Sequence, residues 1–466
     1  MPLLGRARAS LPARSVQPAE GPRTIHFVSL GCPKNLVDTE VMAGLADAAG
    51  FRLVAEPEAA SVIVVNTCGF IGPAKKESID TILGMARHKE AGSCERLVVA
   101  GCLAQRYPHE LAAELPEVDH FLGTSDVGAI AAVLGGEHER MSVGDPGRWV
   151  YSAATPRLRS TPAHTAYVKI AEGCSRRCSF CVIPTMRGTQ RSRPVADIVA
   201  EVSDLAARGA LEINLVSQDT ISYGRDLGDA ATLARLAREV ARVPGPGWVR
   251  LLYLYPERLD DELVAAIRDE PRVAKYVDLP LQHASSRMLR IMRRGVGSDG
   301  QKRLIERLRD RIDGLTIRTA FIVGHPGETD ADFQELCDLV EWARFDHVGV
   351  FRYSPEEGTR SSGLPDPVPA RVAAARFRRL MSLQRRVARE RNRAFVGRRI
   401  QILVEGPSDE SEYLLVGRHA GQAPEIDGVV YLADWDGADP PIGRLVDAQV
   451  TQSADYDLAA SLLPRG

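Results

Sequence analysis

Apolar runs of strand length alternate with helical stretches along the first part of the chain. The apolar runs occupy 25–32, 61–68 and 96–102, with a shorter one at 120–123, and the helical stretches occupy 36–49, 73–90, 108–114 and 125–134. Nearly continuous apolar strands separated by helices are typical of a parallel sheet that is covered on both faces. We therefore predict an N-terminal α/β domain built from β-α-β units.

A second alternation of the same kind follows a stretch rich in Pro, Gly, Ser and Thr. Its candidate strands are 165–170, 211–216, 249–254, 276–279, 316–323 and 347–353, and its helical stretches are 195–208, 230–242, 260–269, 299–312 and 330–344. Six parallel strands with right-handed crossovers form an open barrel, whereas the closed form needs eight. The pattern predicts a central partial (βα)6 barrel.

The end of the chain has a different pattern, in which a Pro- and Gly-rich loop and a long helix precede short strands. The loop covers 355–369, the helix covers 370–394, and the strands cover 398–404, 412–417, 428–432 and 443–451. Short strands separated by turn residues predict a small C-terminal β-barrel of about 65 residues.

These patterns divide the chain into five parts, since 466 residues are too many for one hydrophobic core. We expect a flexible tail (1–22), an N-terminal α/β domain (23–140), a linker (141–163), the partial barrel (164–394) and the small barrel (395–466). The tail lacks the apolar core of a secretion signal, and a transit peptide is the alternative to a flexible tail.

Charge and cysteine content narrow the function classes. The formal net charge of −2 indicates no global attraction to nucleic acid, and no apolar run is long enough to predict a membrane span. Eight cysteines gather after strands instead of forming a spread disulfide framework, which favours a reducing compartment and metal binding.

Cys174, Cys178 and Cys181 stand in one loop, just after the first predicted strand of the partial barrel. A structural zinc site needs four ligands, and no fourth Cys or His follows at finger-like spacing. Three thiolates in one loop suit an iron–sulfur cubane that keeps one iron open. Zinc binding and plain packing are the alternatives.

Three further cysteines end the first three predicted strands: Cys32, Cys68 and Cys102. Gaps of 35 and 33 residues separate them, which is about one βα unit each. Parallel sheets bind ligands outside the carboxyl ends of their strands, so we expect the three thiols to meet there. We predict a second three-cysteine cluster. Ordinary burial is the alternative, and it is what we expect for Cys94 and Cys337.

The spacing Cys-x3-Cys-x2-Cys, with Phe180 before the last Cys, resembles the signature of radical S-adenosylmethionine (SAM) enzymes. The resemblance implies that the open iron of a [4Fe-4S] cluster chelates the amino and carboxylate groups of SAM. One electron then cleaves SAM to methionine and a 5′-deoxyadenosyl radical, so the cofactor carries the difficult chemistry.

Residues 24–460 resemble the radical SAM methylthiotransferases. This implies an α/β multidomain protein with an N-terminal cluster domain, a central partial barrel and a C-terminal TRAM-type β-barrel. It also implies two [4Fe-4S] clusters: an auxiliary one on Cys32, Cys68 and Cys102, and a SAM-binding one on Cys174, Cys178 and Cys181.

Short motifs resemble the branch that modifies an aspartate of ribosomal protein S-twelve. They are SLGCPKNLVDTE (29–40), NTCGFI (66–71), EGCSRRCSFCVIPTMRG (172–188), LPLQH (279–283) and GHPGET (324–329). The alternative branch, which methylthiolates a modified adenosine of tRNA, tends to carry Tyr-Gly-Cys-Gln-Met-Asn at the first cysteine. The protein branch implies ribosomal protein S-twelve as partner, free or in the small subunit. It also implies a flavodoxin or ferredoxin as electron donor, and a cytoplasmic monomer without membrane contact.

Other residues are weaker candidates. We expect Phe180 to pack on the adenine of SAM, with loop packing as the alternative, and Gln282 to face the pocket after a barrel strand. Backbone approach to SAM is the role we consider for Gly324 and Gly327, with a common turn as the alternative. His283 and His325 are candidates for polar pocket walls, with a structural role as the alternative. Contact with the carboxylate of SAM or of the substrate is the role we consider for three arginines, with a surface position as the alternative: Arg187, Arg191 and Arg193.

Charge is uneven near the end of the chain. Residues 400–466 hold three basic residues against twelve acidic ones, among them Asp434, Asp436 and Asp439. A barrel that grips RNA should carry a basic face, so we expect this acidic one to dock a basic ribosomal protein. Residues 371–399 hold eleven arginines and one acid, which either pair with nearby acids or form an RNA-facing ridge.

Overall fold

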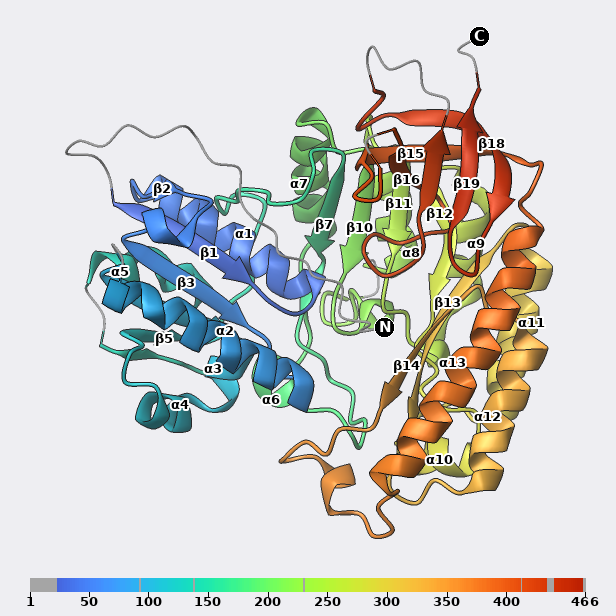
Figure 1. Ribbon diagram of the computed structural model, residues 1–466, viewed down its shortest axis with the longest axis horizontal. Helices are drawn as coiled ribbons and strands as arrows, with labels where there is room; N and C mark the ends of the chain where they lie inside the picture. Colours follow the sequence, from blue (N-terminus) through green and yellow to red (C-terminus); the bar gives the residue numbers. More distant parts are fainter. Residues whose placement is uncertain are drawn as a thin grey trace.

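The computed structural model describes residues 23–91, 94–136, 139–228, 231–411, 413–433 and 440–463. The expected tail at 1–22 and the aspartates Asp434, Asp436 and Asp439 lie outside the described residues. Figure 1 shows an α/β lobe, a central lobe of strands and helices, and a small β-barrel formed by the end of the chain. This is the multidomain α/β arrangement that the hydrophobic pattern predicts.

A six-stranded parallel sheet forms the N-terminal lobe, in the order β2-β1-β3-β4-β5-β6. Its strands are β1 (Thr24–Ser29), β2 (Arg52–Leu53), β3 (Val62–Thr67), β4 (Arg96–Gly101), β5 (His120–Leu122) and β6 (Met141–Ser142). Its helices are α1 (Pro33–Ala48), η1 (Pro57–Ala59), α2 (Gly72–Ala91), α3 (Cys102–Arg106), α4 (Pro108–Glu114), η2 (Val127–Ala129) and α5 (Ile130–Gly135). Val62 and Val64 join one core cluster, and Ile63 and Val65 join the other, so both faces are covered as predicted.

A second six-stranded parallel sheet forms the central lobe, in the order β14-β13-β12-β11-β10-β7. Its strands are β7 (Thr165–Lys169), β10 (Glu212–Val216), β11 (Trp248–Leu251), β12 (Val273–Asp278), β13 (Thr316–Val323) and β14 (His347–Arg352). The two ends of the sheet are not joined within the described residues, which gives the open partial barrel that the sequence predicts.

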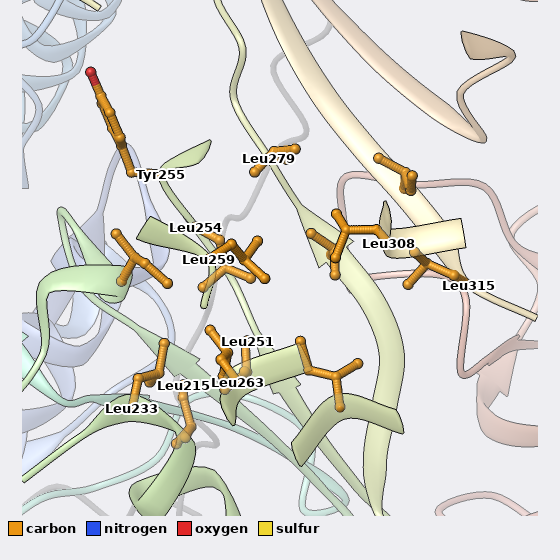
Figure 2. Packing of buried hydrophobic residues seen from close by; sticks show 14 of the residues in the cluster. Leu215, Leu233, Leu251, Leu254, Tyr255, Leu259, Leu263, Leu279, Leu308 and Leu315 are labelled. Carbon is orange, nitrogen blue, oxygen red and sulfur yellow. The ribbon is translucent and has the colours of Figure 1, made fainter. Parts of the chain in front are cut away.

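Helical segments follow these strands along the chain. They are α6 (Ile183–Arg187), α7 (Val195–Ala207), η3 (Thr220–Ser222), α8 (Leu233–Arg242), η4 (Pro256–Arg258), α9 (Asp261–Asp269), α10 (Ser286–Ile291), α11 (Ser298–Arg311), α12 (Asp330–Ala343) and η5 (Arg360–Gly363). Figure 2 shows part of the core between helices and strands, where Leu215, Leu251 and Leu263 pack together. A short pair, β8 (Ala171–Glu172) and β9 (Arg191–Ser192), brackets the cysteine loop that follows β7.

The chain ends in helix α13 (Ala370–Arg393) and a closed barrel of strand order β15-β16-β17-β19-β18. The strands are β15 (Arg399–Pro407), β16 (Leu415–His419), β17 (Val430–Ala433), β18 (Leu445–Ser453) and β19 (Leu458–Leu462). The sequence predicts the first four strands but not β19, whose two buried positions, Leu458 and Ala460, include only one large apolar side chain. No helix of the described chain is both long and apolar enough to cross a membrane.

The C-terminal barrel docks at the amino ends of the central strands. Glu212, the first residue of β10, is fully buried and pairs with Arg418 at 2.6 Å. The first residue of β14, His347, bonds to the carbonyl of Gly421 at 2.9 Å. Figure 1 shows the red barrel at the end of the central sheet where the strands begin. The opposite, carboxyl ends of the strands are therefore left for the functional site.

Candidate functional site

The first three cysteines meet at one edge of the N-terminal sheet. Cys32 caps the start of α1 after β1, Cys68 follows β3, and Cys102 begins α3 directly after β4. The parallel strands β1, β3 and β4 are neighbours, so their carboxyl ends lie side by side. Gly31 has a φ of 93°, and a Cβ there would lie 2.8 Å from the Cβ of Cys68. Glycine therefore allows the close approach of the Cys32 and Cys68 loops.

Electrostatics couple the thiols of this auxiliary triad. Burial and the neighbouring Cys102 and Cys32 raise the pKa of Cys68 to about 12. Burial opposes ionisation of Cys32 as well, but Lys34 and Arg187 outweigh it and lower the pKa of this thiol. Thiolates bind metal only when deprotonated, and crowded buried thiolates are stabilised by the positive charge of iron. Burial of Cys68 and Cys102 disfavours their bare thiolates, and bound iron would supply the compensating positive charge.

The second triad, Cys174, Cys178 and Cys181, lies in the loop between β8 and α6. Burial is the main cause that raises the pKa of Cys174 to about 11 and that of Cys181 to about 12. Each sulfur accepts a hydrogen bond from an N–H group at 3.5 Å. The donors are the backbone N–H of Arg176 for Cys174, Nη1 of Arg294 for Cys178 and the backbone N–H of Ile183 for Cys181. Donors aimed at three sulfurs stabilise thiolates and fit cluster ligands.

A structural zinc ion would need a fourth ligand beside each triad. Within the described residues, no group of three or more His, Cys, Asp or Glu side chains is arranged around a single metal ion. The ligands of a cubane cluster need not surround one metal ion, because each thiolate binds a different iron at a separate corner.

Arg187 connects the two triads. The sequence leaves a surface position open for this residue, but it is only 3% exposed. Its Nε lies 3.3 Å from Cys102 Sγ, and its Nη1 lies 2.6 Å from a carboxylate oxygen of Asp38. Asp38 also pairs with Lys169, which in turn pairs with Glu172, two residues before Cys174. A buried chain of charges thus runs from one cluster site to the other.

A segment after β14 makes a second connection. Glu356, 2% exposed, accepts hydrogen bonds from Lys75 at 2.8 Å and Arg106 at 2.7 Å, both on the auxiliary side. Five residues later, Ser361 donates its backbone N–H to the carbonyl of Ser179 in the second cysteine loop at 2.8 Å. The segment 354–363, called the strap below, therefore contacts both cysteine sites.

The weaker candidate residues lie in different parts of the central lobe. Phe180 is partly buried in the cysteine loop, and Gln282 follows β12 with a positive φ of 73°. His283 is fully buried and contacts Glu328 at 3.2 Å. Gly324 approaches another element and not an open site, since a Cβ there would lie 2.5 Å from the Cβ of Ala373 on α13.

The other histidine, glycine and arginine candidates make internal contacts. His325 bonds to the hydroxyl of Ser361 at 2.8 Å, and Gly327 has a φ of 79°. Arg193 is buried and pairs with Glu201 at 2.5 Å. Among the described residues, Arg191 donates to carbonyl oxygens, at distances of 2.7 to 3.5 Å.

Lys34 and Tyr253 were not singled out from the sequence. The Lys34 ammonium lies 3.4 Å from the centre of the Tyr253 ring, and Lys34 is only 8% exposed. Tyr253 follows β11 at the carboxyl end of the barrel and has a φ of 62°. A lysine in the first turn of a helix is usually solvated, so no local signal reveals this burial.

Family models and relatives agree with the three lobes. The model described as Uncharacterized protein family UPF0004 matches residues 24–123, the Radical SAM superfamily model matches 168–340, and the TRAM domain model matches 396–463. A protein of Sorangium cellulosum (strain So ce56), named ribosomal protein uS12 methylthiotransferase RimO, is 61% identical over 95% of this chain and 91% of its own. The chain belongs to this methylthiotransferase family.

A second family member, the RimO protein of Myxococcus xanthus (strain DK1622), is 50% identical over 95% of this chain and 92% of its own. Membership makes the chain a radical SAM methylthiotransferase, an enzyme that uses SAM and two [4Fe-4S] clusters. The tRNA-modifying alternative finds no support in these relatives.

The fold is shared more widely than the family. The solved structure of the radical SAM methyltransferase TsrM from Kitasatospora setae has a TM-score of 0.52 and 17% identity. The match covers 72% of this chain and 77% of that one, whose structure holds cobalamin and a [4Fe-4S] cluster. At this identity the likeness shows the common fold alone.

Proposed function

We propose that this methylthiotransferase installs a methylthio group on the β-carbon of an aspartate of ribosomal protein uS12, free or in the small subunit. The observation that carries the proposal is the 61% identity to a uS12 methylthiotransferase over 95% of the chain. The geometry is consistent with it, because two three-cysteine sites lie at the carboxyl ends of two parallel sheets and Arg187 and the strap connect them.

The roles of the residues follow from this chemistry. When bound, SAM and its cluster supply a radical that removes a hydrogen which no side-chain base can take as a proton. Cys174, Cys178 and Cys181 hold that cluster; Cys32, Cys68 and Cys102 hold the auxiliary cluster, where sulfur is delivered. Phe180 packs on the adenine of SAM, and Gln282 faces the SAM pocket.

The same proposal covers the setting of the enzyme. It works in the cytoplasm as a monomer, and a flavodoxin or ferredoxin supplies its electrons. The cluster domain spans 23–140, a linker spans 141–163, the radical SAM barrel spans 164–394 and the TRAM-type barrel spans 395–466, after a tail at 1–22. The linker includes the two-residue strand β6, which adds to the edge of the first sheet.

The test is anaerobic reconstitution followed by mass spectrometry. Two cubanes predict about eight irons per chain, and incubation with uS12, SAM and reductant should add the mass of a methylthio group to uS12. Product on tRNA with none on uS12 would overturn the proposal.

Cysteine variants separate the two sites. Replacing Cys174, Cys178 and Cys181 by Ala should leave about half of the iron and stop formation of 5′-deoxyadenosine. Replacing Cys32, Cys68 and Cys102 should spare SAM cleavage but abolish methylthio transfer. Normal product from the second variant contradicts the role in sulfur delivery.

A further inference from the structure

We infer that Lys34 binds the side-chain carboxylate of the target aspartate and thereby selects aspartate over a neutral side chain of the same shape. Lys34 would act on the substrate of the proposed function, on which this inference rests.

Lys34 is a buried cation beside the auxiliary triad. It is the second residue of α1, two positions after Cys32, and it is 8% exposed. In the part of the chain that the structure describes, it forms no ion pair with any carboxylate. The neighbouring cation Arg187, by contrast, is paired with Asp38. Lys34 therefore has charge to offer a ligand.

The surroundings of Lys34 indicate a prepared site. The Tyr253 ring at 3.4 Å and the Cys32 sulfur favour the charged form of Lys34, but neither is the carboxylate that usually pairs with a buried ammonium. Tyr253 adopts a left-handed conformation, with a φ of 62°, which is strained for a bulky side chain. Asp278 holds it there by accepting a hydrogen bond from its backbone N–H at 2.9 Å. Strain beside a buried cation that lacks a carboxylate partner is typical of ligand sites.

The reaction brings a carboxylate to this place. The β-carbon that receives sulfur is bonded directly to the carboxylate carbon of the aspartate. Sulfur delivered at the auxiliary triad must reach that β-carbon, so the carboxylate must also come close to Cys32. A carboxylate that enters a buried site needs a charged or hydrogen-bonding partner, and Lys34 is the cation at that position.

Two other anions compete for Lys34. The carboxylate of SAM fits less well, because in the proposed function SAM binds at the second triad, whereas Lys34 lies two residues after Cys32 of the first. The charge of the auxiliary cluster is the other competitor, since Cys32 is two residues away. Glu425 lines the small cavity beside Cys32, but its carboxylate forms no ion pair with Lys34. A substrate without the carboxylate distinguishes these possibilities.

The experiment compares two enzymes with two substrates. Reconstituted holoenzyme and its Lys34→Met variant are titrated with fluorescently labelled uS12 that carries Asp or Asn at the modified position. Wild type should bind the Asp protein about tenfold more tightly, as expected for a charged hydrogen bond. Lys34→Met keeps the length of the side chain but not its charge, so it should bind both proteins with equal affinity.

Controls separate this role from a structural one. Lys76→Met makes the same change on the exposed side of α2 and should keep the wild-type preference. Iron content and the electron paramagnetic resonance (EPR) spectrum check that both clusters remain, and Lys34→Gln provides a second neutral variant if Lys34→Met loses iron.

An unchanged Asp-to-Asn ratio in the neutral variants overturns the inference. The same ratio together with a shifted potential of the auxiliary cluster also overturns it, and assigns Lys34 to the cluster. If wild-type enzyme binds uS12 but modifies tRNA only, the proposed function fails, which is a separate result from either of these.

Discussion

Arg187 shows how much a single side chain does in this protein. It donates from Nε toward Cys102 Sγ at 3.3 Å and is neutralised by Asp38 at 2.6 Å. Hydrogen bonds and positive charge near cluster sulfurs raise a reduction potential, because they stabilise the more negative, reduced state. Arg187→Met should therefore lower the reduction potential of the auxiliary cluster by roughly 60 mV, which corresponds to a tenfold change in the equilibrium constant of a one-electron reduction. An EPR-monitored redox titration measures the shift.

A nearby arginine provides the control. In the part of the chain that the structure describes, the hydrogen bonds of Arg191 go to carbonyl oxygens, including that of Thr189 at 2.7 Å, so Arg191→Met should leave both cluster potentials unchanged. Arg187→Lys keeps a charge beside Cys102 and should give a smaller shift than Arg187→Met. Equal potentials in wild type and Arg187→Met would contradict a role toward the cluster.

Site residues could be predicted only where they stand close together in the sequence or directly follow a predicted strand. The six candidate cysteine ligands follow predicted strands, and their spacing alone groups them in threes. Arg187 and Asp38 are 149 residues apart and meet only because two lobes pack together, so no local pattern signals their pair. The burial of Lys34 has the same origin, since its partner Tyr253 belongs to the other lobe.

At the scale of elements, the strap joins the lobes through one carboxylate. Burial opposes ionisation of Glu356, but hydrogen bonds from Lys75, Ser354 and Arg106 outweigh it and lower its pKa. Removing one partner of a buried ion pair leaves the others uncompensated, at a cost of about 3 kcal/mol. Glu356→Gln should lower the free energy of unfolding by about that amount at pH 7, as measured by denaturant titration.

The pH dependence checks the cause. A depressed carboxyl pKa contributes stability that is complete above the ordinary glutamate pKa and is lost as the pH falls through the folded value. The difference in stability between wild type and Glu356→Gln should therefore shrink as the solution is acidified below about pH 4.3. Glu357→Gln, at the exposed neighbouring position, should match wild type throughout.

Elements were predictable where the apolar pattern is long and unbroken. The helix expected at 370–394 is α13, Ala370–Arg393, and the strand expected at 316–323 is β13 with the same bounds. The strand predicted at 276–279 begins too late, because β12 starts at Val273 and the exposed Lys275 interrupts its apolar pattern. Two-residue strands such as β8 have no periodicity, since pairing across the sheet alone defines them.

At the scale of the whole molecule, the arginine-rich helix α13 is largely held by acids of the protein itself. Arg389 pairs with Asp455 of the C-terminal barrel at 2.6 Å, and Arg386 pairs with Glu341 of the central lobe at 2.7 Å. Arg376 reaches Glu328 at 2.8 Å. These pairs favour the interpretation that the helix bridges barrel and lobe over that of an RNA-facing ridge, and they leave the acids outside this contact for a partner.

The surplus of negative charge on the C-terminal barrel leads to a prediction about docking. Residues 400–466 carry twelve acidic residues against three basic ones, which suits a basic partner such as a ribosomal protein. Charge reversal of Asp434, Asp436 and Asp439 to Lys in the full-length enzyme should weaken binding of uS12 about tenfold, chiefly through slower association. Wild-type affinity should fall between 0.05 and 0.5 M salt, because the Debye length shortens from about 14 to about 4 Å.

A matched triple variant shows whether position or total charge matters. Glu77, Asp80 and Glu90 are exposed on α2 of the N-terminal lobe, and their reversal to Lys changes the net charge by the same amount. This control should retain most of the affinity for uS12 if the C-terminal barrel is the docking surface. Equal losses in both variants would indicate general attraction between an acidic and a basic protein. Tighter, salt-sensitive binding of tRNA by the wild type would point to the other branch of the family, because phosphate contacts dominate such binding.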